Sequence, residues 1–242
     1  MKEKIKTEID FLKKDNDKNF SLALLFCTLI LFVYCYFGSA SFFEKTFNFI
    51  ENVGFWKIIY HNFMSFLLFF VFGTIFVRFV LKQKNSEMGI KKFKLKPWGI
   101  VCLVAIIPAI LCGVFSSFDL QMLQTYPLIN FNIYFEPWQI ILYYTSYICY
   151  YIGWEFLFRG ILYFSSEKKC GVLGAILITT LISALIHTSI AGFGKPMLET
   201  LSAIPAGFIF GYVASKSRSI YPSLIIHFLI GLSTDLCIFL LA

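Results

Sequence analysis

Residues 138–164 read WQIILYYTSYICYYIGWEFLFRGILYF, and Glu155 and Arg159 are the only acidic or basic residues among them. The stretch is longer than the ~20 residues with which a helix crosses a hydrocarbon core of roughly 30 Å. Because lipid offers no hydrogen bonds, a spanning segment must satisfy its backbone internally, as a helix does. We therefore predict a transmembrane helix that carries two charged side chains.

The composition extends this prediction to the whole chain. Of the 242 residues, 58% are hydrophobic and 14% are charged, whereas a soluble domain has about 45–50% and about 25%. We predict an all-α, polytopic transmembrane bundle in the cell membrane, with the lipid bilayer as its first partner. About seven spans are expected, at residues 20–37, 59–81, 98–115, 138–164, 171–190, 198–215 and 219–241.

Basic residues are concentrated in every second loop. They fill the N-terminal tail and the loops at 82–96, 168–169 and 216–218, whereas the intervening loops hold few. By the positive-inside rule, the N-terminus is cytoplasmic. The net charge is +7, but no arginine-rich patch with interleaved aromatics lies outside the spans, so we expect no nucleic-acid partner. Three parts are expected: a basic tail (1–19), a first transmembrane part (20–137) and a C-terminal transmembrane part (138–242).

Ionisable side chains inside a span are costly, at about 2.5–3.5 kcal/mol each on insertion scales, so each one indicates a partner or a function. Glu155 and Arg159 are four residues apart and lie on one helix face, where they can pair. The alternative is that this pair serves only to satisfy itself. His187 ends the fifth expected span, and His227 lies in the seventh, as does Asp235, for which the sequence indicates no role.

A carboxylate and two histidines can together hydrolyse a peptide bond with water. The carboxylate can act as a general base, and a neutral imidazole can accept a proton, donate to an oxyanion or bind a metal. A lone histidine in a span is more often a packing residue, and we interpret His61, near the outer end of the second span, as interfacial. No GxSxG or HExxH sequence occurs, which disfavours a serine hydrolase and an ordinary zinc protease.

These residues resemble the motifs of the CPBP (Abi) family of intramembrane proteases. That family includes Rce-type CAAX prenyl endopeptidases and bacteriocin-processing or bacteriocin-immunity proteins. The resemblance covers the chain from Trp138 to its end. The family motifs EExxxR, FxxxH and HxxxN/D correspond to residues 154–159, 183–187 and 227–231, in the same order and with the same spacing.

Three positions depart from those motifs: Trp154 replaces the first glutamate, Ser183 the phenylalanine, and Gly231 the asparagine or aspartate. One branch of the family carries a Lys-Pro-x-x-Glu stretch after the second motif, which is matched here by Lys195 and Glu199. If the fifth and sixth spans are antiparallel, Glu199 lies near His187 and supplies the missing carboxylate. Alternatively, Glu199 only complements the macrodipole of its own helix.

The depths of these residues conflict with one shared site. At 1.5 Å per residue from the cytoplasmic ends, Glu155 and His227 lie roughly 12–14 Å deep, but His187 lies at roughly 24 Å. A shared site therefore requires a fifth helix that starts below the membrane or is tilted.

The resemblance implies an intramembrane endopeptidase. Glu155, ordered by Arg159, or else Glu199, would polarise water with His187, and His227 would stabilise the tetrahedral oxyanion. The substrate would be a membrane-associated peptide or protein, prenylated or leader-bearing. Because the family has been described as metalloproteases, Zn²⁺ held by Glu155, His187 and His227 is one option, and a metal-free mechanism is the other. The alternative function is a non-catalytic membrane scaffold or a bacteriocin self-immunity protein, whereas a transporter is disfavoured because no internal repeat is evident.

Overall fold

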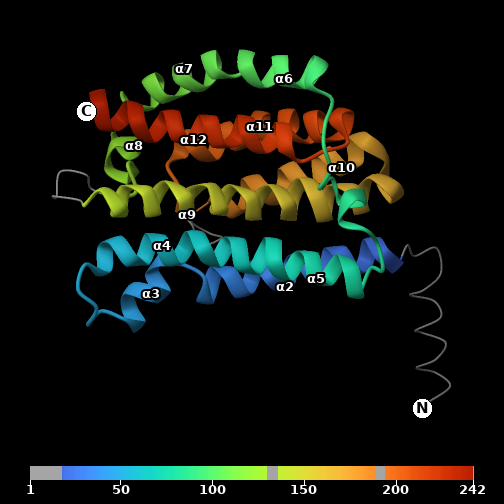
Figure 1. Cartoon of the computed structure of the whole chain (residues 1–242), viewed down its shortest axis with the longest axis horizontal. Coiled ribbons are helices and arrows are strands. Elements are labelled where there is room, and N and C mark those ends of the chain that lie inside the picture. The colour runs from blue at the N-terminus through green and yellow to red at the C-terminus, as the bar shows by residue number, and fades with distance from the viewer. Residues whose placement is uncertain (1–17, 130–135, 189–193, 242) are drawn as a thin grey trace.

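In a computed structural model, the chain folds into a bundle of long helices (Figure 1). The structure describes residues 18–129, 136–188 and 194–241, and within these ranges every regular element is a helix, so the predicted all-α fold is confirmed. The predicted basic tail lies almost entirely outside the described residues. In chain order, the elements are α2 (Lys18–Phe37), α3 (Ala40–Thr46), α4 (Val53–Ser65), η1 (Phe66–Val71), α5 (Phe72–Phe79), η2 (Asn85–Met88), α6 (Leu95–Val104), α7 (Ile106–Ser116), α8 (Leu120–Thr125), α9 (Pro137–Glu155), η3 (Phe156–Leu162), α10 (Tyr163–His187), α11 (Met197–Ser217) and α12 (Tyr221–Leu241).

Six segments among the described residues are long and apolar enough to cross a membrane. The longest, Pro137–His187, would measure about 75 Å as one unbroken helix, more than twice the hydrocarbon thickness. It is interrupted at Gly171, whose φ of 71° and ψ of 177° are non-helical and favour glycine. Its two parts correspond to the fourth and fifth predicted spans. The prediction of about seven spans is therefore confirmed.

The second span begins earlier than the sequence predicted. Helix α4 begins at Val53, whereas the span was expected to begin at residue 59, with Lys57 in the preceding loop. The Lys57 ammonium lies 2.9 Å from the Glu44 carboxylate, and both side chains are partly exposed. The helix can therefore include a lysine, since this charge is paired outside the apolar part of the bundle.

Helix α9 is the centre of the bundle. It packs against α4 on one side and against α12 on the other, and α12 in turn packs against α7. Figure 1 shows the resulting layers, with α6 and α7 at the top, then α11 and α12, then α9, and finally α4, α5 and α2 at the bottom. Charged and tyrosyl side chains on α9 therefore lie in the interior of the molecule.

Small residues hold α10 and α11 close together. A Cβ atom added to Gly207 would lie 3.0 Å from Thr180 Oγ1, and one added to Gly211 would lie 3.1 Å from Ile176 Cγ1. Both glycines belong to the small-xxx-small stripe of α11, in which small residues recur every fourth position. This packing fixes α11, and hence Glu199 in its first turn, relative to the end of α10.

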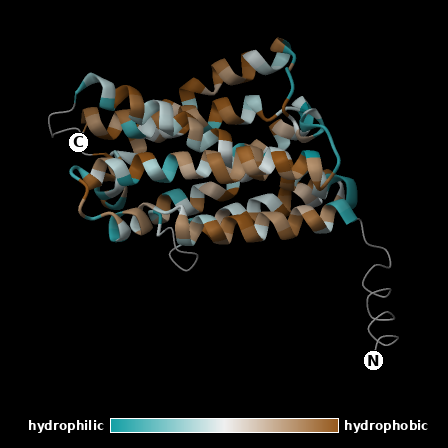
Figure 2. Ribbon diagram, turned by 60° about the horizontal axis from the view of Figure 1, so that its bottom comes forward, coloured by the Kyte–Doolittle hydropathy of each residue, from teal (hydrophilic) through white to brown (hydrophobic). Residues whose placement is uncertain are grey.

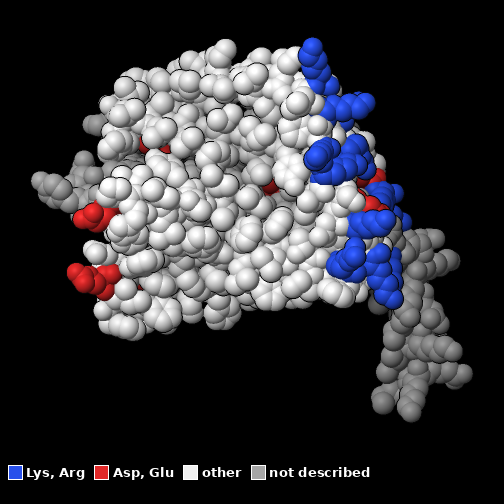
Figure 3. Space-filling model, in the orientation of Figure 1, with Lys and Arg blue, Asp and Glu red and all other residues white. Residues whose placement is uncertain are grey.

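The two ends of the bundle differ in charge. Lysine and arginine gather at one end, where α2 begins (Figure 3). Along the sides the surface is hydrophobic (Figure 2), and large apolar side chains such as Leu29, Ile107 and Leu181 are more than half exposed. The chain is therefore a multi-pass integral membrane protein, and the positive-inside rule assigns its basic end to the cytoplasm.

Candidate active site

A cavity of about 270 Å³ lies inside the bundle, lined by side chains from α3, α4, α9, α10, α11 and α12 and from the loops next to them. Four of the residues predicted for the site line it, namely Arg159, His187, Glu199 and His227. The fifth, Glu155, is fully buried behind His227. The structure thus brings all five together, with Glu155 outside the cavity wall.

Glu155 fixes the orientation of His227. The Nδ1 atom of His227 lies 2.8 Å from Glu155 Oε1, and the same oxygen lies 3.2 Å from Arg159 Nη1. Since a carboxylate only accepts hydrogen bonds, Nδ1 carries the proton and Nε2 is left to face a ligand. Arg159 lies in the π-helical segment η3, where the wider turn follows directly after Glu155. Such segments are often found at functional sites.

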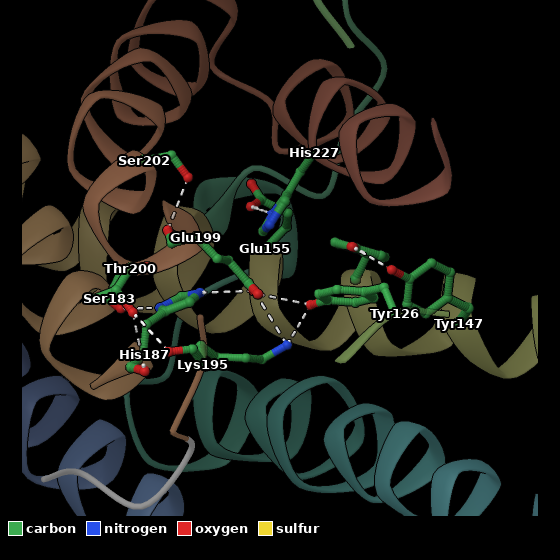
Figure 4. Close-up of polar contacts among 11 residues, drawn as sticks. Tyr126, Tyr147, Glu155, Ser183, His187, Lys195, Glu199, Thr200, Ser202 and His227 are labelled. Atoms are coloured by element: carbon green, nitrogen blue, oxygen red, sulfur yellow. Dashed lines mark hydrogen bonds and ion pairs between the residues drawn. The ribbon is translucent and has the colours of Figure 1, made fainter. Parts of the chain in front are cut away.

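His187 is held at the end of α10 by a backbone contact. Its Nδ1 atom lies 2.5 Å from the Ser183 carbonyl oxygen, which accepts, so Nδ1 carries the proton and Nε2 is the free nitrogen. Nε2 lies 4.0 Å from Glu199 Oε1 (Figure 4), and the two side chains are 21% and 22% exposed. This distance is too long for a direct hydrogen bond but suits one bridging water.

Lys195 and Tyr126 orient the Glu199 carboxylate. Lys195 Nζ lies 3.2 Å from Glu199 Oε1 and donates to Tyr126 Oη at 2.6 Å, while Tyr126 Oη donates to Glu199 Oε2 at 2.9 Å. Burial raises the pKa of Tyr126 well above its usual range, and the charge of Glu199 adds to this. Burial, the largest single cause, lowers the pKa of Lys195, but the attraction of Glu199 together with that of Tyr150 and Tyr151 outweighs it and raises that pKa. Both groups are therefore protonated at neutral pH, and neither can serve as a general base.

The depths of Glu155 and His187 agree better than the sequence count indicated. The fourth helix continues past residue 164 to the interruption at Gly171. Glu155 and His187 both lie sixteen residues from Gly171 (171 − 155 and 187 − 171). At 1.5 Å per residue, each is about 24 Å from this turn. The predicted conflict arose because the fourth span was ended too early.

An aromatic wall completes the cavity, and the sequence interpretation overlooked most of it. Tyr147 and Tyr151 line the cavity from α9, and Trp154 stacks on Phe158 with ring centroids 5.4 Å apart. Residues 147, 151 and 155 recur every fourth position, and this spacing could have placed the two tyrosines on the face of Glu155. Trp154 thus occupies its motif position as a packing residue.

The structure places His61 differently from the sequence interpretation. His61, interpreted as interfacial, lines the cavity and lies 3.1 Å, through Nε2, from the hydroxyl of the fully buried Tyr34. No local sequence pattern predicts this contact between α2 and α4.

Asp235, for which the sequence indicated no role, is fully buried, and Tyr143 Oη donates to its carboxylate at 3.2 Å. This pair joins α9 to α12.

The donor set does not fit the zinc site considered from the sequence. Within the part of the chain that the structure describes, no group of three His, Cys, Asp or Glu side chains is arranged to hold a metal ion. The Glu155 oxygen nearest the histidines is already bonded to His227 Nδ1 and paired with Arg159. Glu155, His187 and His227 therefore do not form a metal-binding triad in this arrangement.

Comparison with known proteins identifies the same region of the chain. Residues 136–233 match a family model described as type II CAAX prenyl endopeptidase Rce1-like. This range contains the three motif segments, and the resemblance predicted from them is confirmed. No curated protein and no solved structure matches the chain.

Proposed function

We propose that this chain, whose residues 136–233 are Rce1-like, is an intramembrane endopeptidase that hydrolyses a membrane-associated peptide. One observation carries the proposal. Glu199 Oε1 and His187 Nε2 face each other at 4.0 Å across the edge of a cavity, a separation that one water molecule can bridge. The proposed reaction uses a water molecule activated by a carboxylate and an imidazole.

In the proposed reaction, Glu199 is the general base and His187 positions the water. The water oxygen attacks the peptide carbonyl carbon, and its proton passes to the Glu199 carboxylate. The tetrahedral intermediate then breaks at the C–N bond, and Glu199 returns the proton to the leaving amine nitrogen. The burial of Glu155 favours Glu199 for this role, because a fully buried carboxylate cannot reach a water in the cavity.

His227 is proposed to stabilise the oxyanion. Its Nδ1–H is bonded to the Glu155 carboxylate, which holds the imidazole ring in place and leaves Nε2 to face the substrate. When Nε2 also carries a proton before the attack, this N–H donates to the oxyanion. In this proposal Glu155 and Arg159 are positioning residues, because they act through His227.

The loops around the cavity indicate from which side the substrate enters. Of the residues that line it, Ser39 and Gly194 belong to the connections after α2 and after α10, and Thr125 ends the short helix α8 in the connection between α7 and α9. These connections alternate with the basic loops and therefore lie at the opposite end of the bundle. We propose that a membrane-anchored peptide enters from the outer half of the bilayer.

Replacement of Glu199 tests the reaction. Glu199→Gln retains the size and hydrogen-bonding capacity of the side chain but removes the base, so we expect kcat to fall about 10²–10⁴-fold. The measurement is cleavage of a library of lipid-anchored, quenched fluorescent peptides by the protein in liposomes. Glu51→Gln is the control, because Glu51 is an exposed acid outside the cavity. We expect activity to persist in a chelator, since the described residues form no metal site.

A non-catalytic scaffold or immunity function is the second candidate, and one feature favours it. Glu155 Oε1 pairs with both Arg159 and His227 within the bundle, and Trp154 is packed between aromatic rings. Such a cluster can serve folding alone. Biological function that survives both Glu199→Gln and His187→Gln in normally inserted protein would favour the scaffold and exclude the peptidase.

A further inference from the structure

The space beside Gly231 is occupied by a tyrosine hydroxyl. A Cβ atom at residue 231 would lie 1.8 Å from Tyr151 Oη and 2.9 Å from Tyr147 Oη. Real Cβ atoms do not approach other atoms so closely, so only glycine leaves room for this hydroxyl. Gly231 therefore permits Tyr151 to reach into the site from α9.

Tyr151 lies directly beside His227. Their ring centroids are 4.7 Å apart at an interplanar angle of 73°, so the edge of one ring faces the other. Tyr151 is one helical turn before Glu155, which binds the other side of the imidazole. Both Tyr151 and His227 line the cavity. A substrate oxygen that reaches His227 Nε2 therefore also approaches Tyr151.

One proton of the tyrosine pair is not used within the protein. Tyr151 Oη and Tyr147 Oη are 3.1 Å apart and share one hydrogen bond. In residues 18–129, 136–188 and 194–241, neither hydroxyl has another hydrogen-bond partner. Two hydroxyls carry two protons, and their mutual bond uses one, so the second remains available for a ligand in the cavity.

We propose that Tyr151 is a catalytic residue that donates this hydrogen bond to the oxyanion, together with His227. When the substrate carbonyl oxygen arrives, the pair reverses, so that Tyr147 donates to Tyr151 and Tyr151 donates to the oxygen. No covalent bond changes in this step, because the hydroxyls only rotate. The inference rests on the proposed endopeptidase function and adds a second oxyanion donor to it. In a desolvated site such a donor is worth about 10²–10³-fold in kcat.

Tyr151→Phe tests the role of the hydroxyl while keeping the ring beside His227. We expect kcat to fall about 10²-fold with little change in KM, because the lost bond forms mainly in the transition state. Tyr144→Phe is the matched control, since Tyr144 lies on the same helix outside the cavity. If the Tyr151 hydroxyl had only a structural role, Tyr151→Phe would instead lower the melting temperature, and kcat would not fall selectively relative to KM.

A swap tests the geometry. Tyr151→Ala vacates the space beside Gly231, and Gly231→Asn in that variant places an amide donor there. We expect the double variant to cleave faster than Tyr151→Ala alone, whereas Gly231→Asn in the otherwise native chain displaces Tyr151 and lowers activity.

Binding of a peptide phosphinate, which mimics the tetrahedral oxyanion, provides a readout without turnover. We expect Tyr151→Phe to bind it about 10²-fold more weakly than the native chain. Equal binding and equal kcat would overturn the role of Tyr151, while the endopeptidase proposal would stand if Glu199→Gln is still inactive. A native chain that neither cleaves peptides nor binds the phosphinate overturns both.

Discussion

Glu155 and Glu199 are both acids of the candidate site, but their surroundings give them different tasks. Glu155 has no exposed surface and lies beside an arginine and a histidine. Glu199 is partly exposed to the cavity and contacts Lys195 and Tyr126. A buried carboxylate that is already bonded can orient and stabilise, whereas an accessible one can exchange a proton with water. The assignment of roles follows from this difference in access.

Breaking a buried ion pair should cost more stability than breaking a partly exposed one. Glu155→Gln leaves the buried Arg159 without a counter-charge, and we expect a loss of about 3–5 kcal/mol of stability. Glu44→Gln removes the partly exposed pair with Lys57, for which less than about 1 kcal/mol is expected. SDS-induced unfolding of the purified protein in detergent measures both. Similar losses in the two variants would show that the Glu155–Arg159 pair is not desolvated.

At the level of single residues, the sequence predicted which ionisable side chains lie together, but it did not predict which of them face the cavity. The spacing of Glu155 and Arg159 indicated their pairing, and the antiparallel argument placed Glu199 near His187, as the structure has them. Helical spacing cannot tell whether a carboxylate faces a cavity or the interior behind a histidine. That choice depends on how α12 packs on α9, which is a contact between segments far apart in the chain.

At the level of elements, close packing of α9 on α4 sets the position of the site. A Cβ atom on Gly153 would lie 2.5 Å from the Ser65 carbonyl oxygen, a backbone atom that cannot move aside. The two helices therefore approach most closely one residue before Trp154. By contrast, a Cβ atom on Gly54, which lies in α4 as Ser65 does, would meet nothing within 4 Å.

Alanine substitutions at these two glycines should have opposite effects. Gly153→Ala forces α4 away from α9, and we expect a loss of about 1–3 kcal/mol together with reduced activity. Gly54→Ala should be neutral or add up to about 1 kcal/mol, because alanine has the higher helix propensity. Melting temperatures of the two purified variants, measured side by side, provide the comparison. A Gly153→Ala protein as stable as the native chain would contradict the close packing.

The sequence indicated most spans but not their irregularities. Hydrophobic length predicted the bundle. The π-helical segments η1 and η3 and the continuation of the fourth helix to Gly171 had no such signal. These features follow from tertiary packing, since the apolar side chains of a span look alike whether the helix is regular or widened.

On the scale of the whole molecule, the basic residues and the connections around the cavity lie at opposite ends of the bundle. Lysine and arginine gather at one end (Figure 3), and the connections that border the cavity alternate with the basic loops and lie at the other. A peptidase with this arrangement would act on peptides that reach the membrane from outside the cytoplasm. This sidedness is a property of the complete bundle and follows from no single motif.

Labelling of single cysteines tests the sidedness. In a variant with alanine at the native cysteines, Thr125→Cys places a thiol beside the cavity, and restored Cys170 places an exposed one at the basic end. With a membrane-impermeant maleimide on intact cells, we expect rapid modification of residue 125 and none of residue 170 until the cells are permeabilised. The reverse pattern would place the basic end outside, contrary to the positive-inside rule, and would require that substrate approach the site from the cytoplasm.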